Sequence, residues 1–182
     1  YSYTLPTIAS VNATVTPKAL SLPGVSITGS STKVYDGTTQ VAPATGTLTQ
    51  SGTVTNMIAG DTLVVDTSAV QLAYNSAHVS DATTIAVSRG APVLTISAST
   101  ANSQLTDYSY TLPTIASVNA TVTPKVLTAT ASANDKIYDG STAATAQLNG
   151  LTGLVGSETV VAAVTAASFD SKDVLLARRV TV

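Results

Sequence analysis

The sequence has 182 residues, of which 44% are hydrophobic and only 10% are charged, with a formal net charge of −2. This balance argues against nucleic acid or an anionic membrane surface as a partner, because both require clustered Lys and Arg. The absence of cysteine excludes disulfides and thiolate metal sites. No run of eighteen apolar residues occurs, so this segment is not expected to insert into a membrane.

The first eighteen residues, YSYTLPTIASVNATVTPK, recur without change at Tyr108–Lys125, 107 residues further on. That offset is the size of one ordinary domain, so the chain is predicted to be part of a tandem repeat array. The repetition divides the chain into three segments. Residues 1–18 are the terminal strand of a preceding repeat, 19–125 are one complete repeat (the first repeat), and 126–182 are an incomplete one (the second repeat).

The repeated segment alternates apolar and polar residues, as in Val11-Asn12-Ala13-Thr14-Val15. A period of two predicts a half-buried strand. Pro6 implies an edge position or a bulge, and Pro17 ends the strand because it cannot donate a ladder hydrogen bond. Thr16-Pro17-Lys18 is then an extended seam between repeats.

Each repeat next contains a Tyr-Asp-Gly turn, within Lys33–Thr39 in the first repeat and Lys136–Thr142 in the second. Asp-Gly after a β-rich segment predicts a tight turn in which Gly takes a positive φ and Asp bonds the backbone. An aromatic ring beside a carboxylate could also contact a sugar. The candidate site residues are therefore the six residues of the two turns: Tyr35, Asp36, Gly37, Tyr138, Asp139 and Gly140.

Further strands are expected along the first repeat from period-two patterns and turn residues. They lie at Thr62–Asp66, around Val70–Tyr74, at Thr83–Ser88 and at Pro92–Ser97, with one or two short strands within Gln40–Asn56. The Ala-rich segment Val160–Ala167 of the second repeat is also expected to be a strand, because its Val and Thr content disfavours a helix.

The second repeat stops before its pattern is complete. Val79 corresponds to Val174 and Val87 to Val182, so the counterpart of Ser88–Lys125 is missing. A partial β-domain with an unpaired edge is unstable or adhesive alone. We expect either that the polypeptide continues at both ends or that neighbouring chains complete each other by strand exchange, since residues 1–18 have part of the missing sequence.

Several motifs in this order resemble the YDG domain. They are Lys33–Thr39, Gly60–Leu63, Asp107-Tyr108 before a strand, the closing Ala120–Leu127, and Phe169–Val174 of the second repeat. That domain recurs in tandem in very large bacterial secreted and surface adhesins, including filamentous-haemagglutinin-like proteins. The resemblance implies a stalk or spacer of an adhesin or biofilm-matrix protein, secreted or on the bacterial cell surface, without catalytic residues.

Two motifs depart from the family pattern. The first repeat has Tyr74 and Ala77 where the pattern has Phe and Lys, and the second repeat has Ser157-Glu158 where the pattern has Gly-Asp. A functional site that depended on these residues would not be kept in both repeats.

Catalytic and metal chemistry are weaker alternatives. His78 with Asp81 or Asp66 and a serine could form a triad, but the second repeat has Asp173 in place of the histidine, so no enzyme is expected. Calcium is the one cofactor considered, because it takes oxygen ligands. The candidate ligand sets are Asp36, Asp61 and Asp66, or Asp135, Asp139, Asp170 and Asp173, although no D-x-D-x-D run is present.

The expected fold class is all-β, with tandem antiparallel β-sandwich repeats of immunoglobulin-like size and a β-grasp-like repeat as the alternative. The predicted core is Val34, Tyr35, Leu63, Val65, Leu72, Ile85, Val87, Leu94, Ile96, Tyr110 and Leu112, with a last row of Ala116, Val118, Ala120 and Val122. The expected function is a mechanical spacer or fibre-building unit whose partners are neighbouring repeats. A module that binds a surface glycan or its own kind is the alternative.

Overall fold

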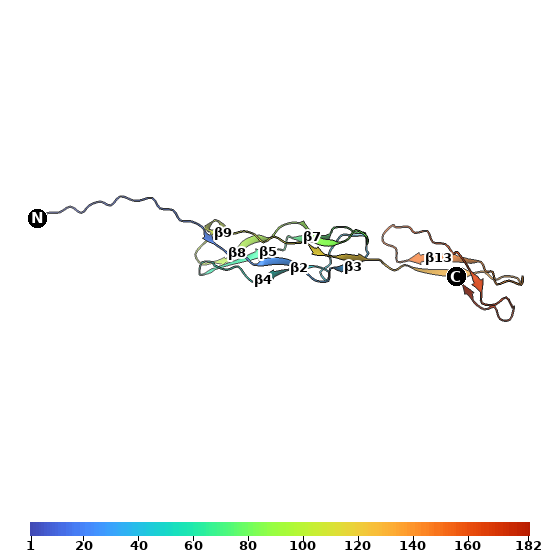
Figure 1. Cartoon of the computed structure of the whole chain (residues 1–182). Coiled ribbons are helices and arrows are strands. Elements are labelled where there is room, and N and C mark those ends of the chain that lie inside the picture. The colour runs from blue at the N-terminus through green and yellow to red at the C-terminus, as the bar shows by residue number, and fades with distance from the viewer. The chain divides into compact units, whose positions relative to one another are not determined.

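The computed structural model describes residues 1–182 and divides them into two compact units. Unit 1 comprises Tyr1–Ser31, Gln40–Tyr74 and Thr84–Ala120, and unit 2 comprises Thr32–Thr39, Asn75–Thr83 and Thr121–Val182. The elements are fifteen strands and one short 3₁₀ helix (Figure 1). The all-β prediction is therefore confirmed, and no α-helix is present for the β-grasp alternative to pack against its sheet. None of the helical structure is long and apolar enough to cross a membrane.

Unit 1 contains four small sheets whose strands come from distant parts of the sequence. Its elements are β1 (Lys18–Ala19), β2 (Gly24–Thr28), β4 (Thr47–Ser51), β5 (Asp61–Asp66), β6 (Gln71–Tyr74), β7 (Thr84–Arg89), β8 (Val93–Ser99), η1 (Leu105–Asp107), β9 (Tyr108–Ser109) and β10 (Val118–Asn119). The antiparallel pairs are β2–β4 and β5–β8, β7 lies between β10 and β6, and β1 pairs in parallel with β9.

The core of unit 1 forms where alternating strand residues point inward. On β5, Asp61, Leu63 and Val65 are buried while the residues between them are exposed. One buried cluster joins six side chains from five parts of the unit: Val25, Val54, Leu63, Val65, Leu94 and Tyr108. Period-two alternation thus gives one buried face per strand.

The predicted core is right for its central strands and wrong for part of its periphery. The buried members are Leu63, Val65, Ile85, Leu94, Ala120 and Val122, and the partly buried ones are Tyr35, Leu72, Val87, Ile96 and Val118. The exposed members are Val34, Tyr110, Leu112 and Ala116. These last residues lie beside the Tyr-Asp-Gly turn or around Pro113, where the backbone is outside any strand or at a strand end and the alternation no longer fixes a face.

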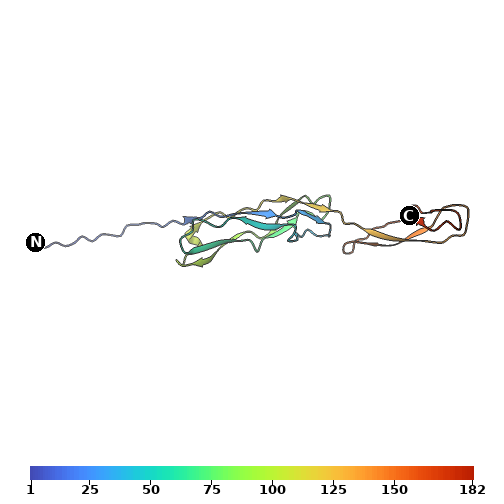
Figure 2. The same ribbon diagram turned by 90° about the horizontal axis from the view of Figure 1, so that it is seen from below.

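The prediction of a half-buried strand at residues 1–18 is wrong for this chain. Residues 1–17 belong to no strand, and all of them are exposed. In Figures 1 and 2 the segment leaves β1 of unit 1 as a single extended stretch. The physical reason is the missing partner, because the same sequence at Tyr108–Lys125 forms β9, β10 and β11 against neighbouring strands.

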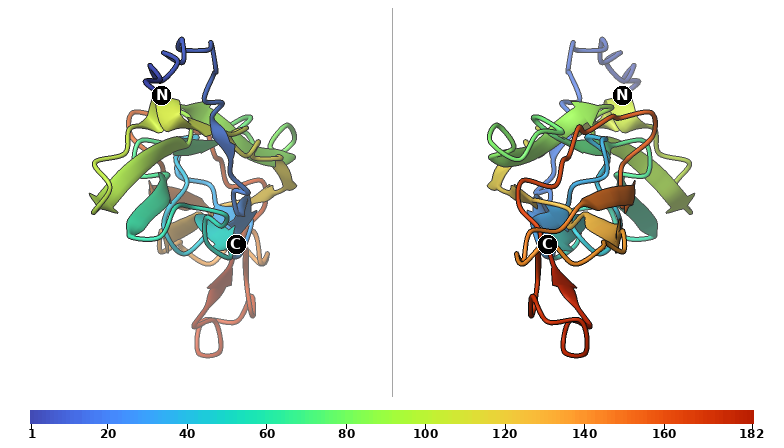
Figure 3. Two further views of the ribbon diagram at one scale, coloured as in Figure 1. Left: turned by 90° about the vertical axis from the view of Figure 1, so that its left-hand side faces the viewer. Right: turned by 90° about the vertical axis from the view of Figure 1, so that its right-hand side faces the viewer.

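Unit 2 consists of two hairpins and one parallel pair. Its strands are β3 (Thr32–Val34), β11 (Thr121–Thr123), β12 (Thr128–Ala133), β13 (Ala146–Thr152), β14 (Ser168–Phe169) and β15 (Val180–Thr181). β3 pairs in parallel with β11, and β12–β13 and β14–β15 are antiparallel. Figure 3 shows the loop of the β14–β15 hairpin in dark red, projecting from unit 2.

The second repeat has little sheet structure beyond these hairpins. The strand expected at Val160–Ala167 does not form, and no residue of 126–182 is buried. In the first repeat the corresponding β5 pairs with β8. The counterpart of β8 would lie after Val182, so within residues 126–182 the segment Val160–Ala167 has no strand to pair with.

The second repeat nevertheless reproduces the registers of the first. β6 pairs Tyr74 with Ile85, and β14 pairs their counterparts Phe169 and Val180. The isolated bridge between Gln40 and Ala73 recurs between Ala143 and Ser168. The parts that the two repeats share therefore recur in structure as well as in sequence.

Candidate functional site

The first Tyr-Asp-Gly turn is closed by a network around one carboxylate. Asp36 Oδ1 accepts hydrogen bonds from Lys33 Nζ at 2.7 Å, from the Thr38 backbone N–H at 2.9 Å and from Thr38 Oγ1 at 3.0 Å. Lys33 Nζ also donates to the Thr38 carbonyl at 2.7 Å. The lysine and the aspartate thus hold both sides of the turn, as expected for an aspartate that bonds the backbone two residues further on.

The second turn repeats this network with one conservative replacement. Asp139 Oδ1 accepts from Lys136 Nζ at 2.8 Å and from the backbone N–H and the hydroxyl of Ser141, both at 2.9 Å. Lys136 Nζ donates to the Ser141 carbonyl at 2.8 Å. Ser141 can replace Thr38 because the hydroxyl is the only side-chain group of this residue that the network uses.

The glycine of each turn occupies the left-handed region of backbone space, with φ of +75° at Gly37 and +76° at Gly140. Residues with a Cβ are strained there, so glycine is the residue that this turn favours. Gly140 has open space around the position of a Cβ, whereas at Gly37 a Cβ would approach Val155 Cγ1 at 3.0 Å. Backbone conformation is the requirement common to both turns.

The lysine–aspartate pair sets the electrostatics of each turn. The hydrogen bond from Lys136, followed by those from Ser141, lowers the pKa of Asp139 from 3.8 to about 2. The hydrogen bond from Lys33 likewise lowers the pKa of Asp36. Both carboxylates are therefore ionised at neutral pH, and their best acceptor atom already has three donors.

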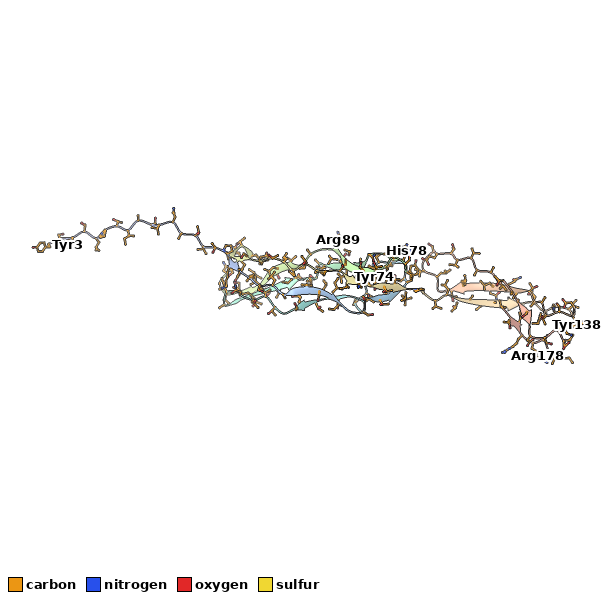
Figure 4. The ribbon with its side chains drawn as sticks, in the orientation of Figure 1. Tyr3, Tyr74, His78, Arg89, Tyr138 and Arg178 are labelled. Atoms are coloured by element: carbon orange, nitrogen blue, oxygen red, sulfur yellow. The ribbon has the colours of Figure 1, made fainter.

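The tyrosines of the two turns differ in their surroundings. The Tyr35 backbone N–H donates to the Thr123 carbonyl at 2.8 Å, which extends the β3–β11 pair. Its hydroxyl donates to Glu158 Oε1, and this hydrogen bond raises the pKa of Tyr35. Tyr138 makes neither a hydrogen bond of this kind to a neighbouring strand nor one to a carboxylate, and 57% of its surface is exposed. In Figure 4 it lies near the tip of the second repeat.

Two hollows in unit 2 adjoin these tyrosines. The hollow beside Tyr35 measures about 560 Å³ and is lined mainly by apolar groups, together with His78, Ser80, Lys125 and Glu158. The hollow beside Tyr138 measures about 240 Å³ and lies between Lys136, Phe169 and Val174. These hollows are the places in unit 2 where a ligand or another chain could contact a turn tyrosine.

The residues considered for catalysis and calcium are not assembled into one site, although Asp36 and Asp139 belong to the turns and His78 lines the hollow beside Tyr35. His78 is exposed in the loop Asn75–Thr83, which Asn75 closes by bonding to Asp81 and Thr83. No three His, Cys, Asp or Glu side chains lie close enough to hold a metal ion. Asp66 caps Ser68 at 2.8 Å, and Asp170 accepts from two backbone N–H groups. These carboxylates close turns.

One buried polar site was not predicted from the sequence. Asp61 at the start of β5 accepts from Ser99 Oγ at 2.6 Å and from the Tyr108 hydroxyl, and these bonds lower the pKa of Asp61. The same contact with Asp61 raises the pKa of Tyr108. The sequence pattern singled out Tyr108, in the repeated segment, and Asp61, in the Gly-Asp motif. Their contact could not be predicted, because no sequence pattern relates two residues that are 47 positions apart. A buried, fully bonded carboxylate of this kind fixes the packing of the strands that carry it.

Comparison with known protein families gives one match, to the YDG domain, over residues 16–116 and again over 123–182. No curated protein and no solved structure matches the chain. The two matched segments each contain one Tyr-Asp-Gly turn, so the family match and the duplicated turn geometry describe the same repetition.

Proposed function

This chain belongs to the YDG domain family, and on that premise we propose that it is a structural repeat segment of a bacterial extracellular adhesin or biofilm-matrix protein. It acts there as a mechanical spacer or as a unit of a fibre, and it is secreted or held at the cell surface. The observation that supports this proposal is the recurrence of the turn network and of part of the strand register in consecutive repeats. Tandem repetition of one structural unit is how extended proteins gain length.

The strand pairing of the first repeat suits a load-bearing role. β1 at the start of the repeat pairs in parallel with β9, and β3 pairs in parallel with β11 near the end of the repeat. When Lys18 and Lys125 are pulled apart, a strand of each parallel pair slides along its partner. All hydrogen bonds of the pair then resist together, whereas bonds that are peeled open break one after another.

Single-molecule force measurement tests this role. The 182-residue chain is placed between marker domains of known unfolding force and stretched. We expect one cooperative unfolding event that releases roughly 380 Å of chain, because the 107 residues of the first repeat each extend by ~3.6 Å. Extension without a force peak would contradict a mechanical role. Thr123→Pro is the matched variant, because it removes a backbone donor at β11, and we expect a lower peak force from it.

A binding module remains the second candidate, favoured by the apolar hollow of about 560 Å³ beside Tyr35. Aromatic rings and nearby carboxylates contact sugars, and Tyr35 and Glu158 both line this hollow. A glycan array probed with the chain and with Tyr35→Ala and Tyr138→Ala variants separates the two functions. Glycan binding that is lost in a folded Tyr35→Ala variant would establish the binding module. If the chain binds no glycan, only the spacer function is supported.

A further inference from the structure

Three peptide bonds of the chain join an aspartate or an asparagine to glycine: Asp36–Gly37, Asp139–Gly140 and Asn149–Gly150. Bonds of this kind rearrange without an enzyme. The glycine nitrogen attacks the side-chain carbonyl carbon of the residue before it, and a succinimide ring forms as water leaves from aspartic acid or ammonia leaves from asparagine. Water then opens the ring to give aspartate or isoaspartate. Glycine favours the reaction because no Cβ crowds the attacking nitrogen.

Aspartate reacts as the neutral acid, because its hydroxyl leaves as water, whereas a carboxylate oxygen has no comparable way to leave. The ion pair of each turn holds the carboxylate in its charged form. Lys33 Nζ lies 2.7 Å from Asp36 Oδ1, and Lys136 Nζ lies 2.8 Å from Asp139 Oδ1. Ring closure removes the negative charge that the ammonium stabilises. The pair therefore opposes both the protonation of the aspartate and the closure of the ring.

Both lysines are held where they can act on the carboxylate. Only 9% of the Lys33 side chain and 26% of the Lys136 side chain are exposed. Each ammonium also donates to the backbone carbonyl two residues beyond the aspartate, so it is fixed on two sides. The hydrogen bond from Lys136 is the largest cause of the lowered pKa of Asp139. Each unit by which this pKa returned toward 3.8 would raise the protonated fraction of Asp139 at neutral pH about tenfold.

The third bond lacks this arrangement. Asn149 Oδ1 accepts a hydrogen bond from the uncharged Ser132 Oγ at 3.0 Å. Asn149 is the extra residue of a β-bulge, because Thr130 lies opposite Gly150 while the next residue of β12 lies opposite Leu148. Asn149 is exposed, and a Cβ at Gly150 would meet no atom within 4 Å. The side chain can therefore approach the glycine nitrogen with few contacts to break.

The same face of the hairpin is open to solvent in the first repeat. Thr49 follows Leu48 on β4 as Asn149 follows Leu148 on β13, and Thr49 is exposed as well. Exposure at this position is therefore common to the two repeats, including the one that has the buried core.

We propose that Asn149–Gly150 is a site of spontaneous modification, and that Lys33 and Lys136 protect the Asp-Gly bonds of the two turns from the same rearrangement. This inference goes beyond the proposed spacer function and does not depend on it. At Asn149 the reaction replaces the amide by a carboxylate. Where isoaspartate forms, the main chain of β13 gains one atom, which shifts the residues beyond Gly150 along β12. Protection of the turns keeps their backbone intact.

The test is prolonged incubation of the full chain at neutral pH and physiological temperature, followed by peptide mapping. Electron-transfer fragmentation distinguishes isoaspartate from aspartate at each position. We expect Asn149 to convert first, with the mass gain of an amide hydrolysed to an acid. Isoaspartate at Asp36 and Asp139 should form much more slowly in the folded chain than in the chain unfolded by guanidinium chloride, where the network is absent.

Matched variants assign the protection to the lysines. Lys136→Ala should speed isoaspartate formation at Asp139 several-fold and leave Asp36 unchanged, and Lys33→Ala should do the reverse. Each turn is thus the control for the other. Circular dichroism shows whether each variant is folded. If Lys33→Ala does not fold, Lys136→Ala decides the question alone, because its lysine belongs to the more exposed turn.

Gly150→Ala is the matched variant for the asparagine. The space around Gly150 accepts a Cβ, and that Cβ crowds the attacking nitrogen. We expect Asn149 to stay intact in this variant while the β12–β13 hairpin is kept.

Either of two results would overturn the proposal. One is an Asn149 that outlasts the aspartates of the two turns in the folded chain. The other is isoaspartate formation at Asp139 that is unchanged or slower in Lys136→Ala. A slower reaction would mean that the lysine delivers a proton to the leaving water instead of protecting the bond.

Discussion

The Tyr-Asp-Gly turn shows how much a residue pattern can predict. Asp-Gly indicated a tight turn with a positive φ at glycine, and the structure has that conformation at Gly37 and Gly140. The role of the lysine three residues before each aspartate was not predicted, because its long side chain can reach many partners. Lys33 and Lys136 bond the carboxylate and a backbone carbonyl at once. Whether any of the six turn residues contacts a ligand stays a prediction.

The acid titration of Asp139 tests the role of the lysine. Its pKa of about 2 lies below the usual 3.8, so its bonds stabilise the turn fully above pH 4 and are lost as the pH falls through about 2. Lys136→Ala removes the largest cause and should move the pKa of Asp139 back toward 3.8. The measurement is the side-chain carboxyl chemical shift of Asp139 against pH. Lys172→Ala is the control, because Lys172 bonds Asp173 and not Asp139, and an equal shift in both variants would contradict the assignment.

At the scale of single elements, the sequence predicted strands correctly where their partners lie in the same chain. The segments expected at Thr62–Asp66 and Thr83–Ser88 are β5 and β7 within one residue at each end. The two failures, residues 1–18 and Val160–Ala167, have equally good strand composition. Alternation tells which face of a strand can be buried, but a strand forms only when another strand is available to accept its hydrogen bonds.

Truncating equivalent side chains in the two repeats measures this difference. Ile85 is fully buried in the core of the first repeat. Ile85→Ala should therefore lower the free energy of unfolding by about 2–5 kcal/mol. Val180 occupies the same register position but is half-buried, and Val180→Ala should cost less than about 1 kcal/mol. Chemical denaturation followed by circular dichroism gives both values. Equal losses would mean that the second repeat is as well packed as the first.

At the scale of the whole molecule, one sequence pattern produces a repeat with a buried core and a repeat without one. The first repeat contains the buried cluster around Leu63 and Leu94, whereas residues 126–182 contain no buried residue. The duplication was evident from the sequence, and so was the length that the second repeat lacks. The distribution of residues between the two compact units was not predicted, because the repeat period does not place Thr32–Thr39 and Asn75–Thr83 in the same unit as Thr121–Val182.

Hydrogen exchange should show this contrast directly. Amides of the β12–β13 hairpin should exchange much faster than those of β5–β8, because a hairpin without a buried face opens at little cost in free energy. Exchange measured by NMR at neutral pH resolves the two pairs. Uniform exchange across both pairs would contradict a loosely held second repeat.

The identity of residues 1–18 with 108–125 also has a kinetic consequence. The first repeat cannot distinguish its own strand from the identical segment of another copy by side-chain contacts, since both present the same eighteen residues. Its own strand is favoured only by the tether, which supplies it at an effective concentration in the millimolar range. Where the local concentration of chains is high, this advantage shrinks. Newly made chains would then exchange strands between first repeats, and the order in which repeats fold would decide which contacts become permanent.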